Sequence, residues 1–209
     1  MLHPDTTLKF VNHIIGSGIF ANEFIPRGTL TYVKDSLEIE LSPLQFNQQD
    51  KAIQSVIDKY SYIDENGHYI VSWDNAKYIN HCCEPNTIST GYGFEIAIKD
   101  IYPGDEITDD YGIFNLEQGF SCECGTSNCR KRILPEDIDN HHKAWDEIIR
   151  PALDEFENVQ QPLLQYLDKG VFELVKEYFN NQHSFRSVQN LKFQKEKVYV
   201  LNNFYINKT

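Results

Sequence analysis

The sequence predicts a mainly β protein with α-helices, in which a β-rich part is followed by a helical extension. Up to about residue 110, short apolar runs alternate with turns that contain Gly, Pro or Asn, which is typical of short strands. From residue 134 on, apolar residues recur at helical spacing. With 209 residues, 41% of them hydrophobic, the chain can form one domain with a small appendage and a true core.

The first 40 residues are predicted to form short strands. Residues 8–11 are a candidate first strand, and residues 29–33 alternate apolar and polar side chains after the turn Pro26-Arg27-Gly28. Between them lies Gly16-Ser17-Gly18-Ile19, where glycine allows a ligand to approach the backbone closely. A plain hairpin turn is the alternative interpretation, and for an isolated Gly-x-Gly it is the commoner one.

The middle of the chain is predicted to contain a helix and further strands. Residues 42–60 have an amphipathic pattern, with Ser42 and Pro43 as a helix start. Residues 60–63 and 69–71 are predicted strands joined by a turn at Asn66-Gly67. Residues 93–99 alternate apolar and polar side chains, which predicts another strand.

Two stretches have an unusual density of polar side chains. The first is Asn80-His81-Cys82-Cys83-Glu84-Pro85-Asn86, and the second runs from Gly104 through Asp109 and Tyr111 to Gly112. Asn and Pro often form ordinary turns, and a lone Tyr is often a half-buried packing residue, so each stretch by itself has a structural interpretation.

Five cysteines cluster at positions 82, 83, 122, 124 and 129. An odd, clustered set without a secretory signal favours metal binding over a disulfide framework. Cys122, Cys124 and Cys129 supply three ligands from one tight loop, and a structural zinc takes a fourth. Spacing alone leaves Cys82 and Cys83 open as the fourth ligand, and thiols without metal are the alternative.

The net charge of −12 argues against a direct nucleic-acid partner, because phosphate binding requires a basic face. An acidic surface is compatible with a basic protein partner such as a Lys- and Arg-rich tail. No apolar run approaches the roughly 20 residues of a membrane span. The first residues lack the features of a signal peptide. We therefore expect an intracellular, soluble protein of cytoplasm or nucleus without a membrane partner, and delivery into another cell stays open.

The C-terminal part is predicted to be mainly helical. One helix is expected to start near Pro135 and to kink or restart at Pro151, and a second is expected over residues 162–179. Packing of these helices on the core is the favoured interpretation, and a platform for a substrate or partner is the alternative. Residues 198–201 form a possible short strand.

Taken together and in order, the glycine segment, the two polar stretches and the cysteine loop resemble the SET domain of protein-lysine methyltransferases. The resemblance covers about residues 8–133. It implies a fold of small curved β-sheets around a knot-like core, the β-clip, with a C-terminal helical extension. The implied domains are a SET domain at 1–120 with a variable insert at 42–60, a post-SET zinc loop at 121–133, and the extension at 134–209.

The resemblance also implies an activity and its residues. The expected reaction is methyl transfer from S-adenosylmethionine (SAM) to a lysine side-chain amine of a histone or other protein, with Tyr111 as the catalytic residue. The implied structural zinc ligands are Cys83, Cys122, Cys124 and Cys129. A SET-like scaffold that binds partners with little turnover is one alternative, and a zinc-stabilised interaction domain is another. The implied SAM contacts are Gly16, Ser17, Gly18, Ile19, Lys77, Tyr78, Asn80, His81, Tyr111, Phe120 and Glu123.

The chain departs from the family pattern at two places. Asp109 stands two residues before Tyr111, where relatives commonly have Phe or Tyr whose size affects how many methyl groups are added. Asp109 could accept a hydrogen bond from the amine or turn to solvent, so the sequence predicts no degree of methylation. Lys77-Tyr78 stands where Arg-Phe or Arg-Tyr is common, and Lys lacks the bidentate geometry of Arg.

Overall fold

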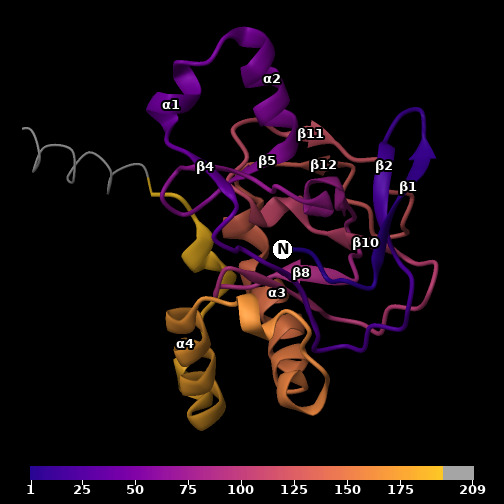
Figure 1. Cartoon of the computed structure of the whole chain (residues 1–209), viewed down its shortest axis with the longest axis vertical. Helices are drawn as coiled ribbons and strands as arrows, with labels where there is room; N and C mark the ends of the chain where they lie inside the picture. Colours follow the sequence, from indigo (N-terminus) through magenta and orange to yellow (C-terminus); the bar gives the residue numbers. More distant parts are fainter. Residues whose placement is uncertain (195–209) are drawn as a thin grey trace, which may run out of the picture.

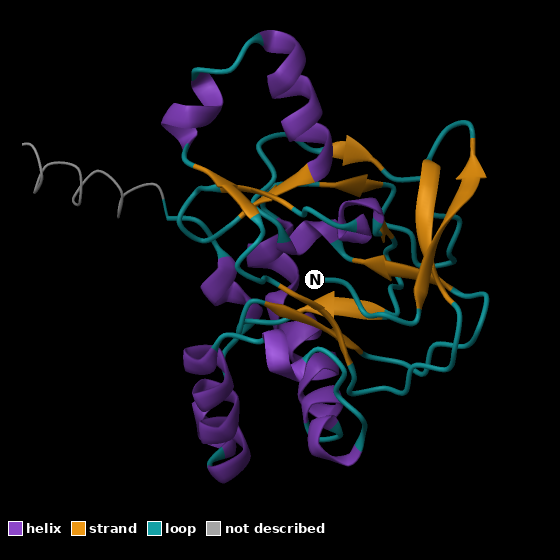
Figure 2. Ribbon diagram, in the orientation of Figure 1, coloured by secondary structure: helices purple, strands orange, loops and turns teal. Residues whose placement is uncertain are grey.

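The computed structural model describes residues 1–194, and in this part the strands occupy the middle of the molecule (Figures 1 and 2). Helices α1 and α2 lie on one side and α3 and α4 on the opposite side. The expected strand at 198–201 lies outside the described residues. The mixture of small sheets with helices confirms the predicted fold class. The helices are α1 (Pro43–Asn47), α2 (Lys51–Tyr60), α3 (Asp137–Leu153) and α4 (Lys169–Asn180).

The two polar stretches lie side by side in one sheet. This sheet has the order β1 (Thr6–Asn12), β2 (Gly16–Ala21), β10 (Glu106–Asp109) and β7 (Asn80–His81). β7 and β10 are parallel, with Asn80 opposite Thr108 and His81 opposite Asp109. The side chain of Asn86 also bonds to β10, since it accepts from Thr108 N and donates to Glu106 O.

The other strands of residues 1–194 form three further small sheets. All their pairings are antiparallel. One has the order β3 (Leu30–Val33), β9 (Phe94–Ala97) and β8 (Thr87–Ser89). The next has the order β4 (Ile39–Leu41), β6 (Tyr69–Val71) and β5 (Ser61–Ile63), and the last pairs β11 (Phe120–Ser121) with β12 (Arg132–Ile133). The 3₁₀ helices of the described part are η1 (Asn75–Tyr78), η2 (Tyr111–Ile113), η3 (Phe156–Asn158), η4 (Leu164–Tyr166), η5 (Gln182–Ser184) and η6 (Val188–Leu191).

The helix expected over 42–60 is two helices. Ser42 and Gln45 form a reciprocal capping box that starts α1, as predicted, but α1 ends at Asn47. Asp50 then accepts hydrogen bonds from Ala52 N and Ile53 N, which starts α2 as a separate helix. The turn at Asn66-Gly67 is confirmed, because β5 and β6 pair on either side of it.

The strand expected over 93–99 is present as β9, but both of its faces are covered. Residues 94–97 are all buried, and Glu95 is only 6% exposed. An alternating pattern usually predicts one solvent face. Here the polar position points into the molecule, which makes Glu95 a buried carboxyl group that needs an explanation.

The C-terminal helices pack on the core, as predicted. α3 begins at Asp137 and continues through Pro151 in its last turn before ending at Leu153. The second helix starts later than expected, at Lys169, because the Asp168 side chain caps it by accepting from Val171 N. Residues from α3 and α4 share one apolar cluster with β3, β8 and β9, among them Trp145, Ile149, Val175 and Tyr178. No helix within residues 1–194 is long and apolar enough to cross a membrane.

Candidate functional site

The glycine segment, here β2, lies directly against Asn80 and Glu106. Asn80 Nδ2 donates to Ser17 O at 3.1 Å and to Glu106 Oε1 at 2.7 Å. A methyl group added at Gly18 would lie 2.3 Å from Glu106 Oε1 and 2.8 Å from Asn80 Nδ2, so both side chains would have to shift to admit it. Gly16 has a φ of +88°, which favours glycine. The two motifs thus form one surface of closely packed backbone and amide groups.

His81, Tyr111 and Phe120 form an aromatic cluster, and His81 is the residue next to Asn80. The rings of His81 and Tyr111 are 5.5 Å apart between centroids, His81 and Phe120 are 5.7 Å apart, and Tyr111 and Phe120 are 6.2 Å apart. The structure therefore brings together the polar stretches of 80–86 and 104–112 and the start of the cysteine loop.

The four remaining residues expected to contact SAM are not part of this aromatic cluster. They are Lys77, Tyr78, Ile19 and Glu123. Lys77 Nζ donates to Asp74 O, and Tyr78 contacts the ring edge of Tyr60. The side chain of Ile19 is fully buried in the core, which leaves only its backbone for a ligand. Glu123 is exposed between two cysteines of the loop.

Tyr111 is fixed at both its hydroxyl and its backbone. Its hydroxyl donates to Ile79 O at 2.5 Å, and its N–H donates to His81 Nδ1 at 3.1 Å. Burial raises the pKa of the Tyr111 phenol, and the nearby carboxyl groups of Asp109 and Glu95 raise it further. Tyr111 is therefore neutral near pH 7, and its oxygen keeps lone pairs free to accept a hydrogen bond.

A cavity of about 560 Å³ opens in front of the Tyr111 ring. Its walls include Ile79, Asp109 and Glu95, and the end of α2 supplies a further wall through residues 58–60. Tyr62 and Phe114, whose rings stack 5.3 Å apart, also line it. The cavity is large enough for a long side chain, and its lining combines apolar and polar groups.

The His81 imidazole lies between Tyr111 and the cysteines. Because Nδ1 accepts from the Tyr111 N–H, the ring proton belongs on Nε2, which is 3.4 Å from Cys83 Sγ. Burial lowers the pKa of His81, so the neutral ring is favoured.

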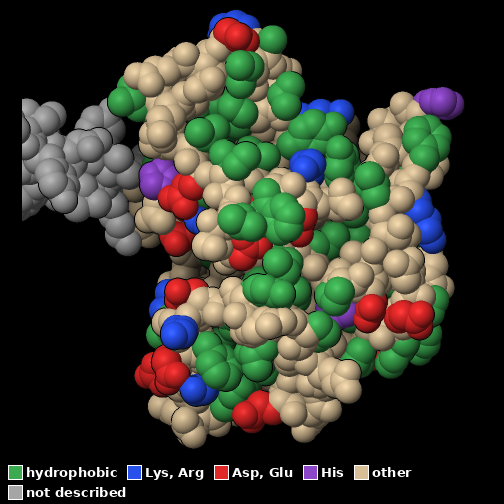
Figure 3. Space-filling model, in the orientation of Figure 1, with side chains coloured by type: hydrophobic (Ala, Val, Ile, Leu, Met, Phe, Trp, Pro, Cys, Tyr) green, Lys and Arg blue, Asp and Glu red, His purple; other side chains and the backbone are tan. Residues whose placement is uncertain are grey.

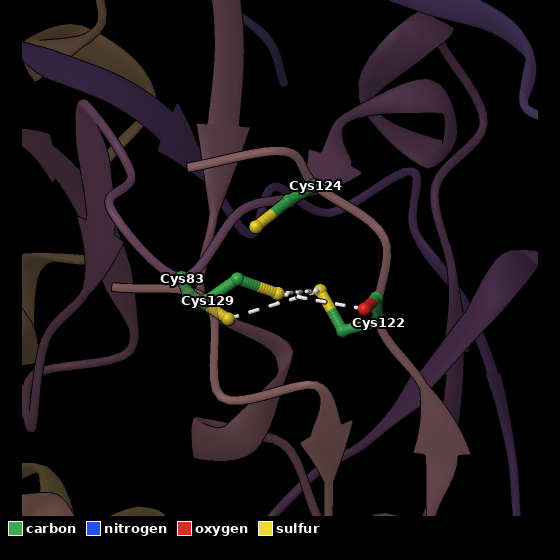
Figure 4. A group of neighbouring side chains, drawn as sticks. All are labelled: Cys83, Cys122, Cys124 and Cys129. Carbon is green, nitrogen blue, oxygen red and sulfur yellow. Dashed lines mark hydrogen bonds between the residues drawn. The ribbon is translucent and has the colours of Figure 1, made fainter. Parts of the chain in front are cut away.

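The Sγ atoms of Cys83, Cys122, Cys124 and Cys129 lie within 4.8 Å of one another, and Figure 4 shows them converging. Cys122 Sγ is 3.7 Å from both Cys83 Sγ and Cys129 Sγ. Four sulfurs about 2.3 Å from a central zinc would be about 3.8 Å apart, so the cluster fits a tetrahedral zinc site. Cys82 lies outside the cluster.

Asp110 connects the site to the rest of the chain. It forms an ion pair with Arg130 Nη2 at 2.5 Å and accepts from Trp145 Nε1 at 3.2 Å and from Gly112 N at 3.0 Å. Arg130 comes from the cysteine loop and Trp145 from α3. These contacts hold the residue next to Tyr111 from two sides.

Sequence reasoning missed Glu95, Glu106, Asp110, Arg130 and Trp145 as residues of the site. Glu106 and Asp110 were inside a recognised motif but had no role assigned to them. The alternating pattern around Glu95 was visible, but no local pattern shows which strand face is covered. The Trp145 contact spans 35 positions and left no signal in the sequence.

The charged side chains of the described residues on the face shown in Figure 3 form no basic patch of the kind that would indicate a nucleic-acid partner. In Figure 3 the Lys and Arg side chains of the described residues are scattered over this face among acidic ones. The expectation that the protein has no direct nucleic-acid partner stays a prediction.

Curated relatives share similarity with part of this chain. It is 30% identical over 139 residues to "Histone-lysine N-methyltransferase trithorax" of Drosophila melanogaster, which covers 62% of this chain and 4% of that protein. It is 31% identical over 132 residues to "Variant-silencing SET domain-containing protein" of Plasmodium falciparum, covering 54% and 5%. It is 24% identical over 158 residues to "Putative histone-lysine N-methyltransferase ASHH4" of Arabidopsis thaliana, covering 66% and 42%. The chain thus spans less than half the length of these relatives.

A solved structure and a family model also match. The structure is described as "crystal structure of KRYPTONITE in complex with mCHG DNA and SAH", with 24% identity and a TM-score of 0.40, over 58% of this chain and 27% of that one. Residues 16–112, from the first glycine of β2 to the residue after Tyr111, match the family model described as "SET domain". The glycine segment and the two polar stretches lie in this range, while the cysteine loop follows it. By this match, residues 16–112 of the chain form a SET domain.

Proposed function

We propose that this chain is a SAM-dependent protein-lysine N-methyltransferase. The observation that carries the proposal is the position of Tyr111. Its hydroxyl is held by Ile79 O, both residues line the 560 Å³ cavity, and Asn80 and His81 follow Ile79 directly. The SET-domain match over residues 16–112, together with relatives named histone-lysine N-methyltransferases, supports this assignment.

The SAM site is proposed at the surface formed by β2 and β7. Backbone groups of residues 16–19 and the side chain of Asn80 would hold the amino-acid portion, with His81, Lys77, Tyr78, Phe120 and Glu123 around the remainder. The close packing at Gly18 supports this placement, because a side chain there would displace Asn80 and Glu106. SAM supplies an activated methyl group on a sulfonium.

Tyr111 would orient the lysine amine. Since its O–H donates to Ile79 O, only lone pairs remain, and these accept from an N–H of the substrate. Alignment of the amine with the methyl group is a large part of catalysis in an in-line displacement. A lysine amine has a pKa of about 10.4, so supplying it neutral at pH 7 costs about 4 to 5 kcal/mol. The site therefore needs a means to remove a proton.

We also propose that the cysteine cluster holds one structural zinc. Cys83 belongs to the stretch 80–86, while the other three ligands belong to the loop between β11 and β12. A zinc at this position would fix the loop against His81, because His81 Nε2 lies 3.4 Å from Cys83 Sγ. The loop also carries Arg130, whose ion pair with Asp110 extends the support to Tyr111.

The proposed substrate is a lysine in a basic protein segment. The net charge of −12 would favour the approach of a basic tail. Relatives that are named histone-lysine N-methyltransferases make core histones the first proteins to test. The intracellular location expected from the sequence stays a prediction.

The test is methyl transfer from labelled SAM to a panel of core histones and lysine-rich peptides. We expect label on lysine with the wild type and a loss of about 100-fold or more with Tyr111→Phe, which keeps the ring but removes the hydroxyl. SAM binding by calorimetry should be similar in both proteins. Transfer that does not depend on Tyr111 would contradict its role. SAM binding without transfer to any protein of the panel would favour the scaffold function instead.

A further inference from the structure

Two buried carboxyl groups line the cavity together with Tyr111. Glu95 on β9 is 6% exposed and Asp109 on β10 is fully buried, and both line the 560 Å³ cavity. Ser89 connects them, since it pairs with Glu95 across β8 and β9 and donates its hydroxyl to Asp109 Oδ2 at 2.9 Å. The cavity is thus lined by two buried acids and by the tyrosine expected to hold the amine.

The two acids differ in their hydrogen bonds. Asp109 accepts from Ser89 Oγ, from Ser89 N at 3.3 Å and from Asp110 N at 2.6 Å. Glu95 Oε2 is buried without any partner among the described residues. A buried carboxyl oxygen without a partner is costly. An N–H group entering the cavity from a ligand would supply the missing donor.

The charged neighbours of the pair have other partners. The Met1 ammonium acts on Glu95 through its charge and lowers its pKa, but it forms ion pairs with Asp35 and Glu38. No ion pair within residues 1–194 involves Glu95 or Asp109. Lys77 lines the cavity, but its ammonium donates to Ser72 O and Asp74 O. The other titratable groups around the pair or along the cavity are Tyr32, Tyr62, Tyr69, Tyr111, Glu106, Asp110, Asp58, Lys59, Tyr60 and Glu117.

Burial and mutual repulsion make these acids hold protons more strongly than ordinary carboxyl groups. Burial raises the pKa of Asp109 to about 7. Burial, and then the charge of Asp109, raises the pKa of Glu95 well above its usual range. Tyr111 cannot serve as a base because its own pKa is raised. The pair is therefore a proton acceptor available near neutral pH among the groups that line the cavity with Tyr111.

We propose that the Glu95–Asp109 carboxyl pair accepts a proton from the ammonium group of the substrate lysine in this cavity. The inference rests on the proposed function and deepens it. The N–H bond of the ammonium breaks, its electrons stay on nitrogen as a lone pair, and an O–H bond forms on the carboxyl pair. One buried cation and one buried anion become two neutral groups, which a desolvated site favours. Tyr111 holds the neutral amine by accepting another of its N–H bonds.

A second cavity gives the proton a way out. This cavity, of about 220 Å³, is lined by Glu95 as well, together with Tyr62, Ile63, Phe114 and Asn115. The same five residues line the first cavity, so they form the wall between the two. Glu95 can therefore take up a proton on one side of the wall and exchange it on the other, which resets the pair for the next turnover.

The experiment compares the pH dependence of kcat/KM in the wild type, Glu95→Gln and the double variant Glu95→Gln/Asp109→Asn, using the panel protein that the wild type methylates fastest. Wild-type kcat/KM should reach a plateau near neutral pH. The double variant should lose about 100- to 10,000-fold at pH 7 and recover about tenfold per pH unit towards the amine pKa. Glu95→Gln, which retains Asp109, should show a smaller loss of kcat/KM at pH 7 than the double variant. Glu173→Gln is a matched control, because Glu173 is exposed on α4 and should leave the profile unchanged.

A second set of measurements tests the Glu95–Asp109 pair by folding and peptide binding, without any methyl transfer. Thermal melting of the SAM-free proteins tests whether the variants fold, and calorimetry compares binding of a lysine peptide with its norleucine analogue, which lacks the amine. The wild type should bind the lysine peptide more tightly, and the double variant should lose most of this preference. Parallel pH profiles in folded variants, or an unchanged lysine preference, would overturn the inference while the proposed function stands. No transfer by the wild type to any panel member would overturn both.

Discussion

The Trp145 indole on α3 donates a hydrogen bond to Asp110, the residue directly before Tyr111, over 3.2 Å. Trp145 is 5% exposed, and the Arg130 guanidinium lies 5.8 Å from its ring centre. A residue of the C-terminal extension and one of the cysteine loop thus meet at the same carboxylate. The extension is therefore part of the support of the candidate active site, in addition to packing on the core.

Trp145→Phe should destabilise the protein and reduce turnover. The change keeps an aromatic ring but removes one donor from a buried carboxylate, which should cost about 1 to 3 kcal/mol of unfolding free energy. Urea unfolding measures this cost. Trp73→Phe is the matched control: Trp73 also donates to an aspartate, Asp35, but is 44% exposed, so its loss should cost under about 0.5 kcal/mol. Equal costs at the two positions would contradict the proposed support.

Adjacent cysteines should respond differently to substitution. Cys83→Ser should abolish zinc binding, because Cys83 Sγ is part of the four-sulfur cluster, while Cys82→Ser should retain one zinc per chain. Elemental analysis of the purified proteins measures the zinc. Loss of the metal should also lower the melting temperature sharply, since structural zinc contributes on the order of 10 kcal/mol. Zinc in both variants, or in neither, would show that the ligand set is wrong.

The cysteine loop shows how far the sequence alone could predict the site. Three ligands on one tight loop follow from spacing, because such a loop brings its own thiols together. The fourth ligand is on another segment, so spacing could not distinguish Cys82 from Cys83. The resemblance to SET domains selected Cys83, and the geometry of the cluster agrees with that choice.

Other features depended on tertiary contacts that no local pattern records. The amphipathic pattern over 42–60 was correct, but the cap at Asp50 divided it into two helices. The inward orientation of Glu95 depends on sheets and helices covering both faces of β9. The burial of Glu95 is thus a feature that sequence patterns predict least well.

Replacing either of two glycines of β2 by alanine should have different effects: Gly18→Ala on SAM binding and Gly16→Ala on stability. Gly18→Ala places a methyl group 2.3 Å from Glu106 Oε1, so Asn80 and Glu106 must move and SAM binding should weaken about tenfold or more. Gly16→Ala has open space but a φ of +88°, so it should cost about 1 kcal/mol of stability through backbone strain with a smaller effect on SAM. Calorimetry with SAM and urea unfolding separate the two effects. The reverse pattern would show that Asn80 and Glu106 do not define the SAM site.

Asp109 should make the protein less stable as the pH rises from about 4 to about 7. Its pKa in the folded protein is about 7, above the usual value of 3.8, so the folded state retains a proton that the unfolded chain releases in this range. Below the range both states are protonated, and above it both are ionised, so the loss is complete near pH 7 and on the order of a few kcal/mol. Asp109→Asn should remove this part of the pH dependence.

The measurement is urea unfolding of wild type, Asp109→Asn and Glu173→Gln at several values between about pH 4.5 and about pH 8. The difference between wild type and Asp109→Asn reports on Asp109 together with its effect on the pKa of Glu95, because zinc binding and the remaining carboxyl groups are common to both proteins. Asp109→Asn should gain stability relative to the wild type as the pH rises, while Glu173→Gln should track the wild type, since Glu173 is exposed. A constant difference across the range would mean that Asp109 has an ordinary pKa, and Glu95 would then have to act as the proton acceptor without it.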